Sequence, residues 1–320
     1  MQSPTPKSLH RLSIDNPWFA VHPLFWTLQH LRLLHCYFQH LDSAITTSSS
    51  PSSVADKDLT LHSRRLAKIR SPIVKSISVG HLLCHQGSPM EKVDGSPPFL
   101  FAGRGVHLPE CHIFRVRATG IQKRPIVGYY HYNNVARERQ RALTPKSHPN
   151  GSYNYPVSRI YQRRLRNVAP ALWFEDPYLV CILLSLAQLQ RRRRQLPRPK
   201  TFNARLLVTN KSDTTHAHIF QADIPYDVLE TLDHPTLDME NIKWPTIRHI
   251  QVPFEPYSSF AERIVVQLVD DEYKSDVKTQ ASMIPRGEKR KRDKSDAMGQ
   301  RRNVKSLDSM RLAAVSLANG

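Results

Sequence analysis

The segment from Trp173 to Arg194 constrains the fold more than any other part of the sequence, because its pattern predicts a buried central helix. Apolar residues occupy nearly every side of a helix between Leu179 and Leu189, which is typical of a helix enclosed by other elements. Asp176 can accept hydrogen bonds from the free amides of the first turn, and Pro177 suits the first helical position because an N–H there would lack a partner. The helix is therefore expected to begin at Pro177 and to end in arginines that favour the negative end of its dipole.

Strand patterns follow this helix after the Pro-Arg-Pro break at 197–199. Two apolar runs separated by a polar loop predict a pair of strands, and a third run alternates apolar and polar residues. Further helices are expected after Asp223 and after Ser258 or Ser259. The predicted strands are Ala204–Thr209, His216–Ala222 and Thr246–Val252. The expected order over 173–272 is α-β-β-α-β-α, an α+β or α/β fold with one modest core.

The rest of the chain lacks such periodicity. Its 24 prolines against 11 glycines predict many interrupted elements, because proline fixes φ and lacks a backbone donor. We therefore predict a single small domain with a largely irregular N-terminal half, where two of the apolar runs 73–79, 99–101 and 126–132 form strands. A poorly defined gene model for residues 1–150 is an alternative explanation of that half. Four parts are predicted. Residues 1–60 form an arm with one helix at Pro23–Leu41 and a Ser-rich linker at 46–60, and residues 61–154 form a poorly ordered Pro- and His-rich region. The α/β domain follows at 155–273 and a disordered basic tail at 274–320.

Charge is distributed unevenly along the chain. The formal net charge is +19, which is typical of proteins with nucleic-acid or other anionic partners. Residues 159–203 contain 10 basic and 2 acidic side chains, whereas residues 204–273 contain 5 basic and 12 acidic ones. The positive net charge of the whole chain therefore does not apply to residues 204–273, which are acidic. Any anionic partner is expected to bind the basic segments on either side.

The number of cysteines and the hydropathy of the chain limit the cellular compartments in which the protein is expected. Four scattered cysteines are too few for a disulfide framework and favour a reducing environment. The longest apolar run, Leu179–Leu189, has 11 residues, whereas a membrane span needs about 20. The N-terminus lacks the pattern of a secretory signal, although its few acidic residues keep a mitochondrial presequence as an alternative. We predict a soluble nuclear or cytoplasmic protein without membrane contact.

Three blocks resemble a known group of proteins. They are Asp176-Pro177-Tyr178 leading an apolar helix, the strand Leu206–Thr209, and Pro253-Phe254-Glu255-Pro256-Tyr257 leading into a helix. In this order they resemble a widespread family of uncharacterised fungal proteins, over about 100 of the 320 residues. The resemblance implies a shared fold and brings no known activity or catalytic residue.

Arginine clusters flank the predicted central helix and give the candidate binding residues. Phosphate groups are bound by such clusters, and nearby tyrosines at 153, 155 and 161 are available for stacking on bases. A solvated, dipole-complementing helix end is the simpler explanation of the second cluster. The candidate nucleic-acid-binding residues are Arg163, Arg164, Arg166, Arg191, Arg192, Arg193 and Arg194.

The tail contains a second kind of basic cluster. The run Lys289, Arg290, Lys291, Arg292 is typical of nuclear-import signals, and a solvated tail without an address explains it equally well.

Metal chemistry is a further alternative. His81, Cys84 and His85 form one cluster, and His107, Cys111 and His112 form another, so together they have enough nitrogen and sulfur atoms for a zinc ion, although at no familiar spacing. Carboxylates at 213, 223, 227 and 240, with Lys243, are candidates for a metal-dependent nuclease, but no strand has the Glu-x-Lys of that class. Helix capping and solvent exposure explain these acids more simply. We therefore predict no metal and no cofactor.

The patterns together favour a non-enzymatic interaction module, predicted to be nuclear, with protein partners and with nucleic acid contacting its basic flanks. The alternative is a metal-dependent nuclease-like or nucleic-acid-binding protein. The two differ in geometry, because a nuclease requires Asp213, Asp223 or Asp227 to converge within about 4–5 Å, whereas a module leaves them in solvent.

Overall fold

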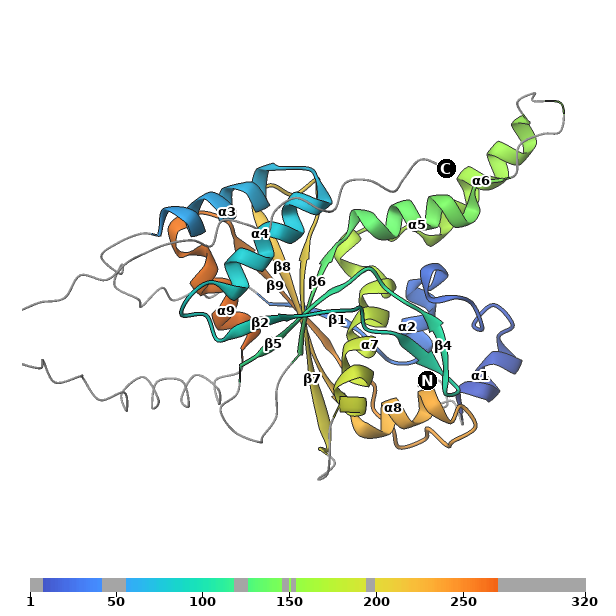
Figure 1. Cartoon of the computed structure of the whole chain (residues 1–320). Helices are drawn as coiled ribbons and strands as arrows, with labels where there is room; N and C mark the ends of the chain where they lie inside the picture. The colour runs from blue at the N-terminus through green and yellow to red at the C-terminus, as the bar shows by residue number, and fades with distance from the viewer. Residues whose placement is uncertain are drawn as a thin grey trace, which may run out of the picture. The chain divides into compact units, whose positions relative to one another are not determined.

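The predicted central helix exists and organises the molecule. In the computed structural model, which describes residues 8–41, 56–117, 126–145, 150, 154–193 and 199–269, α7 (Pro177–Arg193) lies against the middle of a mixed β-sheet (Figure 1). All residues from Pro177 to Gln188 are buried. Asp176 Oδ1 accepts a hydrogen bond from the backbone N–H of Tyr178 at 2.9 Å, so the helix begins as the sequence predicts.

The sheet has seven strands and draws on both halves of the chain. Its spatial order is β1-β9-β8-β7-β6-β5-β2, with β6 parallel to β7, β1 parallel to β9 and the other neighbours antiparallel. Helix α7 is the crossover that makes β6 and β7 parallel. The strands are β1 (Phe38–Leu41), β2 (Met90–Val93), β5 (His112–Val116), β6 (Ile126–His131), β7 (Thr201–Thr209), β8 (His216–Pro225) and β9 (Ile247–Pro253). A separate hairpin consists of β3 (Phe99–Phe101) and β4 (Arg104–His107).

Helices cover both faces of this sheet (Figure 1). Helices α3 (Lys57–Lys68), α4 (Pro72–Cys84) and α9 (Phe260–Leu268) pack on one face, which we call the α4 face. The α7 face carries α7, the β3–β4 hairpin and four shorter helices: α1 (Leu9–Asp15), η1 (Pro23–Phe25), α2 (Leu28–Leu33) and α8 (Tyr226–Asp233). The remaining elements are α5 (Asn133–Leu143), α6 (Tyr155–Val168), η2 (Trp173–Glu175) and η3 (Tyr257–Ser259). The sheet therefore separates two apolar cores, one on each face.

Strand β6 lies between β5 and β7, and all six of its residues are buried. Gly128 in this strand allows α7 to approach closely. A Cβ atom there would lie 2.8 Å from Leu186 Cδ1 and 2.9 Å from both Cys111 Sγ and Leu206 Cδ1.

The mixed α/β class and the order α7-β7-β8-α8-β9-α9 are confirmed. The predicted extent of the domain is wrong, because β1, β2, β5 and β6 lie before residue 155 and belong to the same sheet. Within the described ranges, residues 61–154 contain most of α3, the helices α4 and α5, the β3–β4 hairpin and the sheet strands β2, β5 and β6 instead of a poorly ordered region. Ordered elements in this half also remove the argument for a poorly defined gene model. The tail at 274–320 lies outside the described residues.

Two local predictions in the first half are also wrong. The expected helix at 23–41 is a short η1, the helix α2 and the strand β1, with His35 at a positive φ of 52° between the last two. The Ser-rich linker was expected to extend to residue 60, but residues 57–60 begin α3, while residues 46–55 lie outside the described ranges. The prediction that two of the three apolar runs form strands is confirmed, because 99–101 and 126–131 are strands, whereas 73–79 belongs to α4.

Candidate functional site

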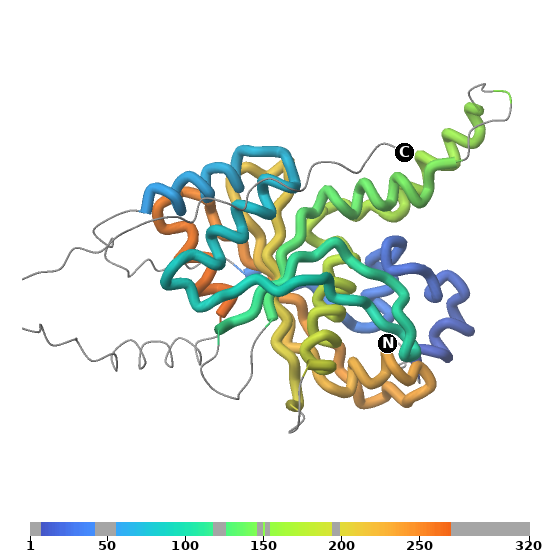
Figure 2. Tube along the Cα trace, viewed as in Figure 1, coloured from blue at the N-terminus to red at the C-terminus, as the bar shows by residue number. Residues whose placement is uncertain are grey.

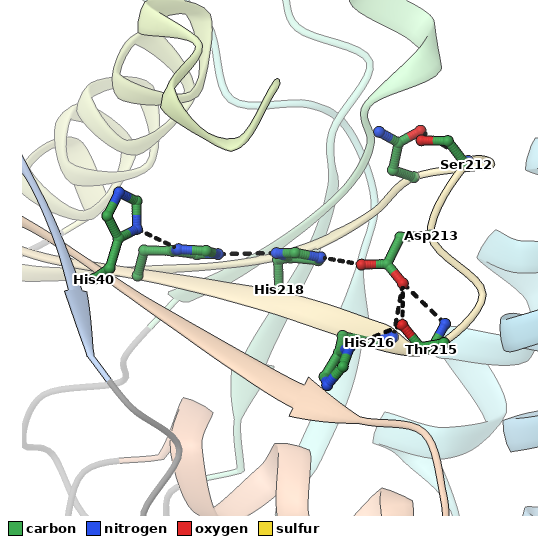
Figure 3. Close-up of polar contacts among 8 residues, drawn as sticks. His40, Ser212, Asp213, Thr215, His216 and His218 are labelled. Carbon is green, nitrogen blue, oxygen red and sulfur yellow. Dashed lines mark hydrogen bonds and ion pairs between the residues drawn. The ribbon is translucent and has the colours of Figure 1, made fainter. Parts of the chain in front are cut away.

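A row of histidines crosses three strands on the α7 face and ends on a carboxylate (Figure 3). His40 Nδ1 on β1 lies 2.8 Å from His249 Nδ1 on β9, and His249 Nε2 lies 2.8 Å from His218 Nδ1 on β8. His218 Nε2 lies 2.8 Å from Asp213 Oδ2 in the β7–β8 loop. At the other end, His40 Nε2 lies 2.9 Å from Glu175 Oε1. We call these five residues the acid–histidine chain.

Strand geometry explains why the rings meet. His40 is paired in register with His249, and His218 is two residues away from the partner of His249 on β8. Alternate strand residues point to one face, so Phe38, Ile247 and Phe220 share the α7 face with the histidines. The three histidines of the acid–histidine chain therefore occupy strand positions that face the core, where apolar side chains are usually found.

Aromatic residues of η2 cover the rings. Phe174 stacks on His249 with centroids 5.0 Å apart, and Trp173 meets His218 edge-on at 4.5 Å. His218 and His249 are each 1% exposed, whereas the side chain of His40 is 44% exposed. The two middle rings are therefore enclosed, whereas both ends reach solvent: the side chains of Glu175 and Asp213 are 27% and 21% exposed.

Asp213 is the fixed acid of this chain. Its Oδ1 accepts hydrogen bonds from the Thr215 hydroxyl at 2.7 Å and from the backbone N–H groups of Thr215 and His216 at 2.8 and 2.9 Å. Burial alone would raise the pKa of Asp213, but these bonds and the bond from His218 together hold it well below its usual range. Asp213 is therefore a carboxylate at neutral pH.

The four contacts of the acid–histidine chain need four protons, whereas three neutral histidines supply only three. Four contacts join five groups, and each hydrogen bond needs one proton between its two atoms. Burial, followed by the neighbouring rings of His218 and His40, lowers the pKa of His249 to about 3, so His249 stays neutral. Chemically, the arrangement is a continuous row of hydrogen-bonded rings between two carboxylates, along which a proton can pass.

The structure separates the predicted arginines into two groups. Arg163, Arg164 and Arg166 lie on α6, which has no buried residue and extends away from the sheet with α5 (Figure 2). Arg191, Arg192 and Arg193 end α7, about 25 Å from its beginning. Arg191 forms an ion pair with Asp233 and lies over the Tyr226 ring at 5.6 Å, so it has a structural role. Arg194, Tyr153 and the import-signal candidate Lys289–Arg292 lie outside the described residues.

The carboxylates proposed for metal-dependent cleavage do not converge. Asp213 lies in the loop before β8, whereas Asp223 lies near the far end of that strand, and the strand from His216 to Asp223 is about 23 Å long. Asp223 pairs with Arg205 at 3.3 Å and Arg248 at 2.9 Å, and Asp227 is exposed in the first turn of α8. Asp213 does not point into solvent either, because His218 binds it.

The two Cys/His clusters also stay apart. Cys111 is buried, and His107 Nε2 lies 2.6 Å from the hydroxyl of Tyr178. All four cysteines are free thiols. Among the described residues, the metal-ligand types that gather in a group of three or more are Asp58, His62 and His81, a set that the sequence did not single out.

Sequence reasoning also missed His40, Glu175, His218 and His249. The signal was present, because each histidine stands two residues from an apolar residue on a strand face: Phe38, Phe220 and Ile247. Arg159, four residues before Arg163 on the same face of α6, was missed as well.

Comparisons with known proteins leave the chain without a family. No family model matches it, and no curated protein sequence matches it significantly. The resemblance to uncharacterised fungal proteins therefore stays a prediction. Among the described residues, no helix is long and apolar enough to cross a membrane.

Proposed function

We propose that this chain is an interaction module whose helix α6 binds single-stranded nucleic acid along a stripe of arginines. The observation that supports this proposal is the composition and position of α6. The helix carries Arg159, Arg163, Arg164 and Arg166, contains no acidic residue and buries no side chain. None of these arginines forms an ion pair with a described residue, so their charges are available to a partner.

Helical geometry arranges three of the arginines in a line. Arg159, Arg163 and Arg166 are at positions i, i+4 and i+7, which share one face of a helix. They lie about 6 Å and 4.5 Å apart along the axis. Three guanidinium groups in such a line can each contact a phosphate of one nucleic-acid strand that runs along the helix. We call this line the arginine stripe.

One feature favours a nucleic-acid strand over a lipid surface. Val157, Tyr161, Leu165 and Val168 of α6 are half-buried, and Ile160 is the one exposed Val, Ile or Leu of this helix, at 53%. A helix that binds at a membrane interface needs a broad exposed apolar face, which these residues do not form.

A cellular compartment and protein partners follow from this function. A nucleic-acid-binding module belongs in the nucleus or cytoplasm, and Lys289–Arg292 is the candidate import signal. Protein partners remain part of the proposal for surfaces other than the arginine stripe.

Fluorescence anisotropy with a labelled 20-nucleotide single strand tests the proposal. We expect the triple variant Arg159→Gln, Arg163→Gln, Arg166→Gln to bind at least tenfold more weakly than the unchanged chain. The slope of log affinity against log salt should fall by about 2, because each single-strand phosphate contact contributes about 0.7. Measurements on the full chain and on a chain ending at Lys278 separate this stripe from the basic tail.

The matched control removes the same charge elsewhere. Arg164 is turned at least about 100° from the stripe, and Arg192 and Arg193 lie at the far end of α7. The variant Arg164→Gln, Arg192→Gln, Arg193→Gln should keep most of the affinity. Equal losses in both triple variants would contradict the arginine stripe and indicate non-specific charge. An absence of binding in the unchanged chain would reject nucleic acid, and cleavage in added magnesium would support the nuclease alternative instead.

A further inference from the structure

Two histidines and an aspartate meet between α3 and α4, on the opposite sheet face from the acid–histidine chain. Asp58 and His62 are one turn apart on α3, and His81 approaches from α4. One ligand atom from each residue lies within 4.8 Å of the others. His62 Nε2 lies 3.5 Å from Asp58 Oδ1. We call this group the α3–α4 cluster.

The imidazoles of His62 and His81 lie face to face. The rings of His62 and His81 stack with centroids 4.0 Å apart and planes 8° from parallel. Two protonated rings would repel each other at this distance. A neutral ring has a nitrogen lone pair for a metal ion.

One nitrogen of His62 already has a partner that would orient it. His62 Nδ1 lies 3.4 Å from Ser78 Oγ, and both residues are buried. Metal-binding histidines ordinarily have their second nitrogen hydrogen-bonded in this way. Nε2, which faces Asp58, remains for coordination.

The helices that carry the ligands are fixed to each other. Residues 69–71 join α3 to α4, and the buried Lys75 on α4 donates a hydrogen bond to the carbonyl of Leu66 on α3 at 2.6 Å. Asp58 and His81 are exposed, so the cluster is open to solvent on one side. A rigid frame and an open side are what an ion needs to enter and bind.

We propose that Asp58, His62 and His81 form a zinc site with its remaining coordination positions open to solvent. Zinc accepts imidazole nitrogen and carboxylate oxygen at about 2.0–2.2 Å, so tetrahedral ligand atoms lie about 3.4 Å apart. Because the two rings now lie in nearly parallel planes, the exposed ring of His81 has to turn out of the stack to direct a nitrogen at an ion bound by His62 and Asp58. Three protein ligands with an open fourth position are typical of zinc sites that bind water or a small anion. This site goes beyond the proposed function, because it shares no residue with the arginine stripe.

Isothermal titration of the metal-freed full chain with zinc chloride tests the site. We expect one saturable site in the unchanged chain, and loss of affinity by more than tenfold in His81→Ala. Because His81 is exposed, this variant should fold. Ser78→Ala should weaken binding less, since it removes only the orienting partner of His62.

The matched control is His10→Ala, which removes an exposed histidine of α1 outside the cluster. It should bind zinc like the unchanged chain. A second readout is the visible absorption of bound cobalt, which should be lost in His81→Ala and kept in His10→Ala. No saturable binding, or equal binding by His81→Ala and the unchanged chain, would overturn the proposal.

Discussion

At the residue scale, Asp176 shows what a local pattern reveals and what it hides. The sequence predicts it as the cap of α7, and its Oδ1 does accept the N–H of Tyr178. The same carboxylate also accepts two hydrogen bonds from Arg139, at 2.6 and 2.8 Å, and one from the Tyr132 hydroxyl at 2.8 Å. These partners lie 37 and 44 residues away in sequence, and no local pattern identifies them.

Replacing Asp176 tests how much its ion pair with Arg139 contributes to the free energy of unfolding. Asp176→Asn keeps the shape but leaves the buried guanidinium of Arg139 without a counter-charge. We expect the free energy of unfolding to fall by about 3–5 kcal/mol, measured by urea denaturation. Adding Arg139→Met should recover part of the loss, because it removes the unpaired charge. A change below about 1 kcal/mol in the single variant would show that the pair is not a stabilising contact.

The acid–histidine chain was not predictable from the same kind of evidence. His40, His218 and His249 are far apart in sequence, and only the parallel pairing of β1 with β9 brings the first and last together. The local signal, an apolar residue two positions away on the same strand face, places each histidine on the core side of its strand but does not show that the three rings meet. Two members of the arginine stripe, Arg163 and Arg166, were among the predicted candidates, whereas Arg159 and the helix that aligns the three residues were not predicted.

At the element scale, the sequence predicted those helices and strands whose hydrophobic periodicity and end residues indicate the same structure. Helix α7 and strands β7, β8 and β9 were predicted because their periodicity and end signals agree. Residues 38–41 continue the apolar spacing of a helix, yet they form a strand because β9 offers backbone partners. Tertiary pairing here overrides local preference.

Strand β6 provides a test of packing at this scale. Gly128→Ala should lower the free energy of unfolding by about 1–3 kcal/mol, because its Cβ would press on Leu186, Cys111 and Leu206. Thermal or urea unfolding measures the loss. Gly105→Ala in β4 is the matched control, since a Cβ there meets no atom within 4 Å, and it should change stability by less than about 0.5 kcal/mol. Equal effects at both positions would contradict close packing of α7 on β6.

At the scale of the whole molecule, buried neutral histidines make stability depend on pH. Burial, with smaller effects of neighbouring groups, lowers the pKa of His107 and His131 to about 4 and that of His249 to about 3. Between these values and 6.5 the unfolded chain binds more protons than the folded one, so stability rises with pH across this window. We expect urea unfolding to show a steep loss of stability from pH 6.5 down to pH 4.

His249→Gln separates the contribution of one ring from the total. The variant should be less stable at pH 7, because it interrupts the acid–histidine chain, but its stability should depend less on pH. Curves for the variant and the unchanged chain that run parallel between pH 4 and 6.5 would contradict a neutral His249.

The sheet also shows why the domain boundary at 155 could not be predicted. Strand β7 has a sheet neighbour on each side, β6 from the first half and β8 from the second. A fragment of residues 155–273 would expose the hydrogen-bonding edge of β7 and remove β1 from the edge of β9. Composition marks the first half as irregular, but its short strands are stabilised by partners that composition does not reveal.

The pairing of β1 with β9 has a consequence for synthesis on the ribosome. Strand β1 ends at Leu41, and its only neighbour in the sheet among the described strands begins at Ile247. At about 5–20 residues per second, roughly 10–40 s pass between the translation of the two strands. During that delay the apolar N-terminal segment has no place in the sheet, so a newly made chain needs shielding from aggregation until its last strand emerges.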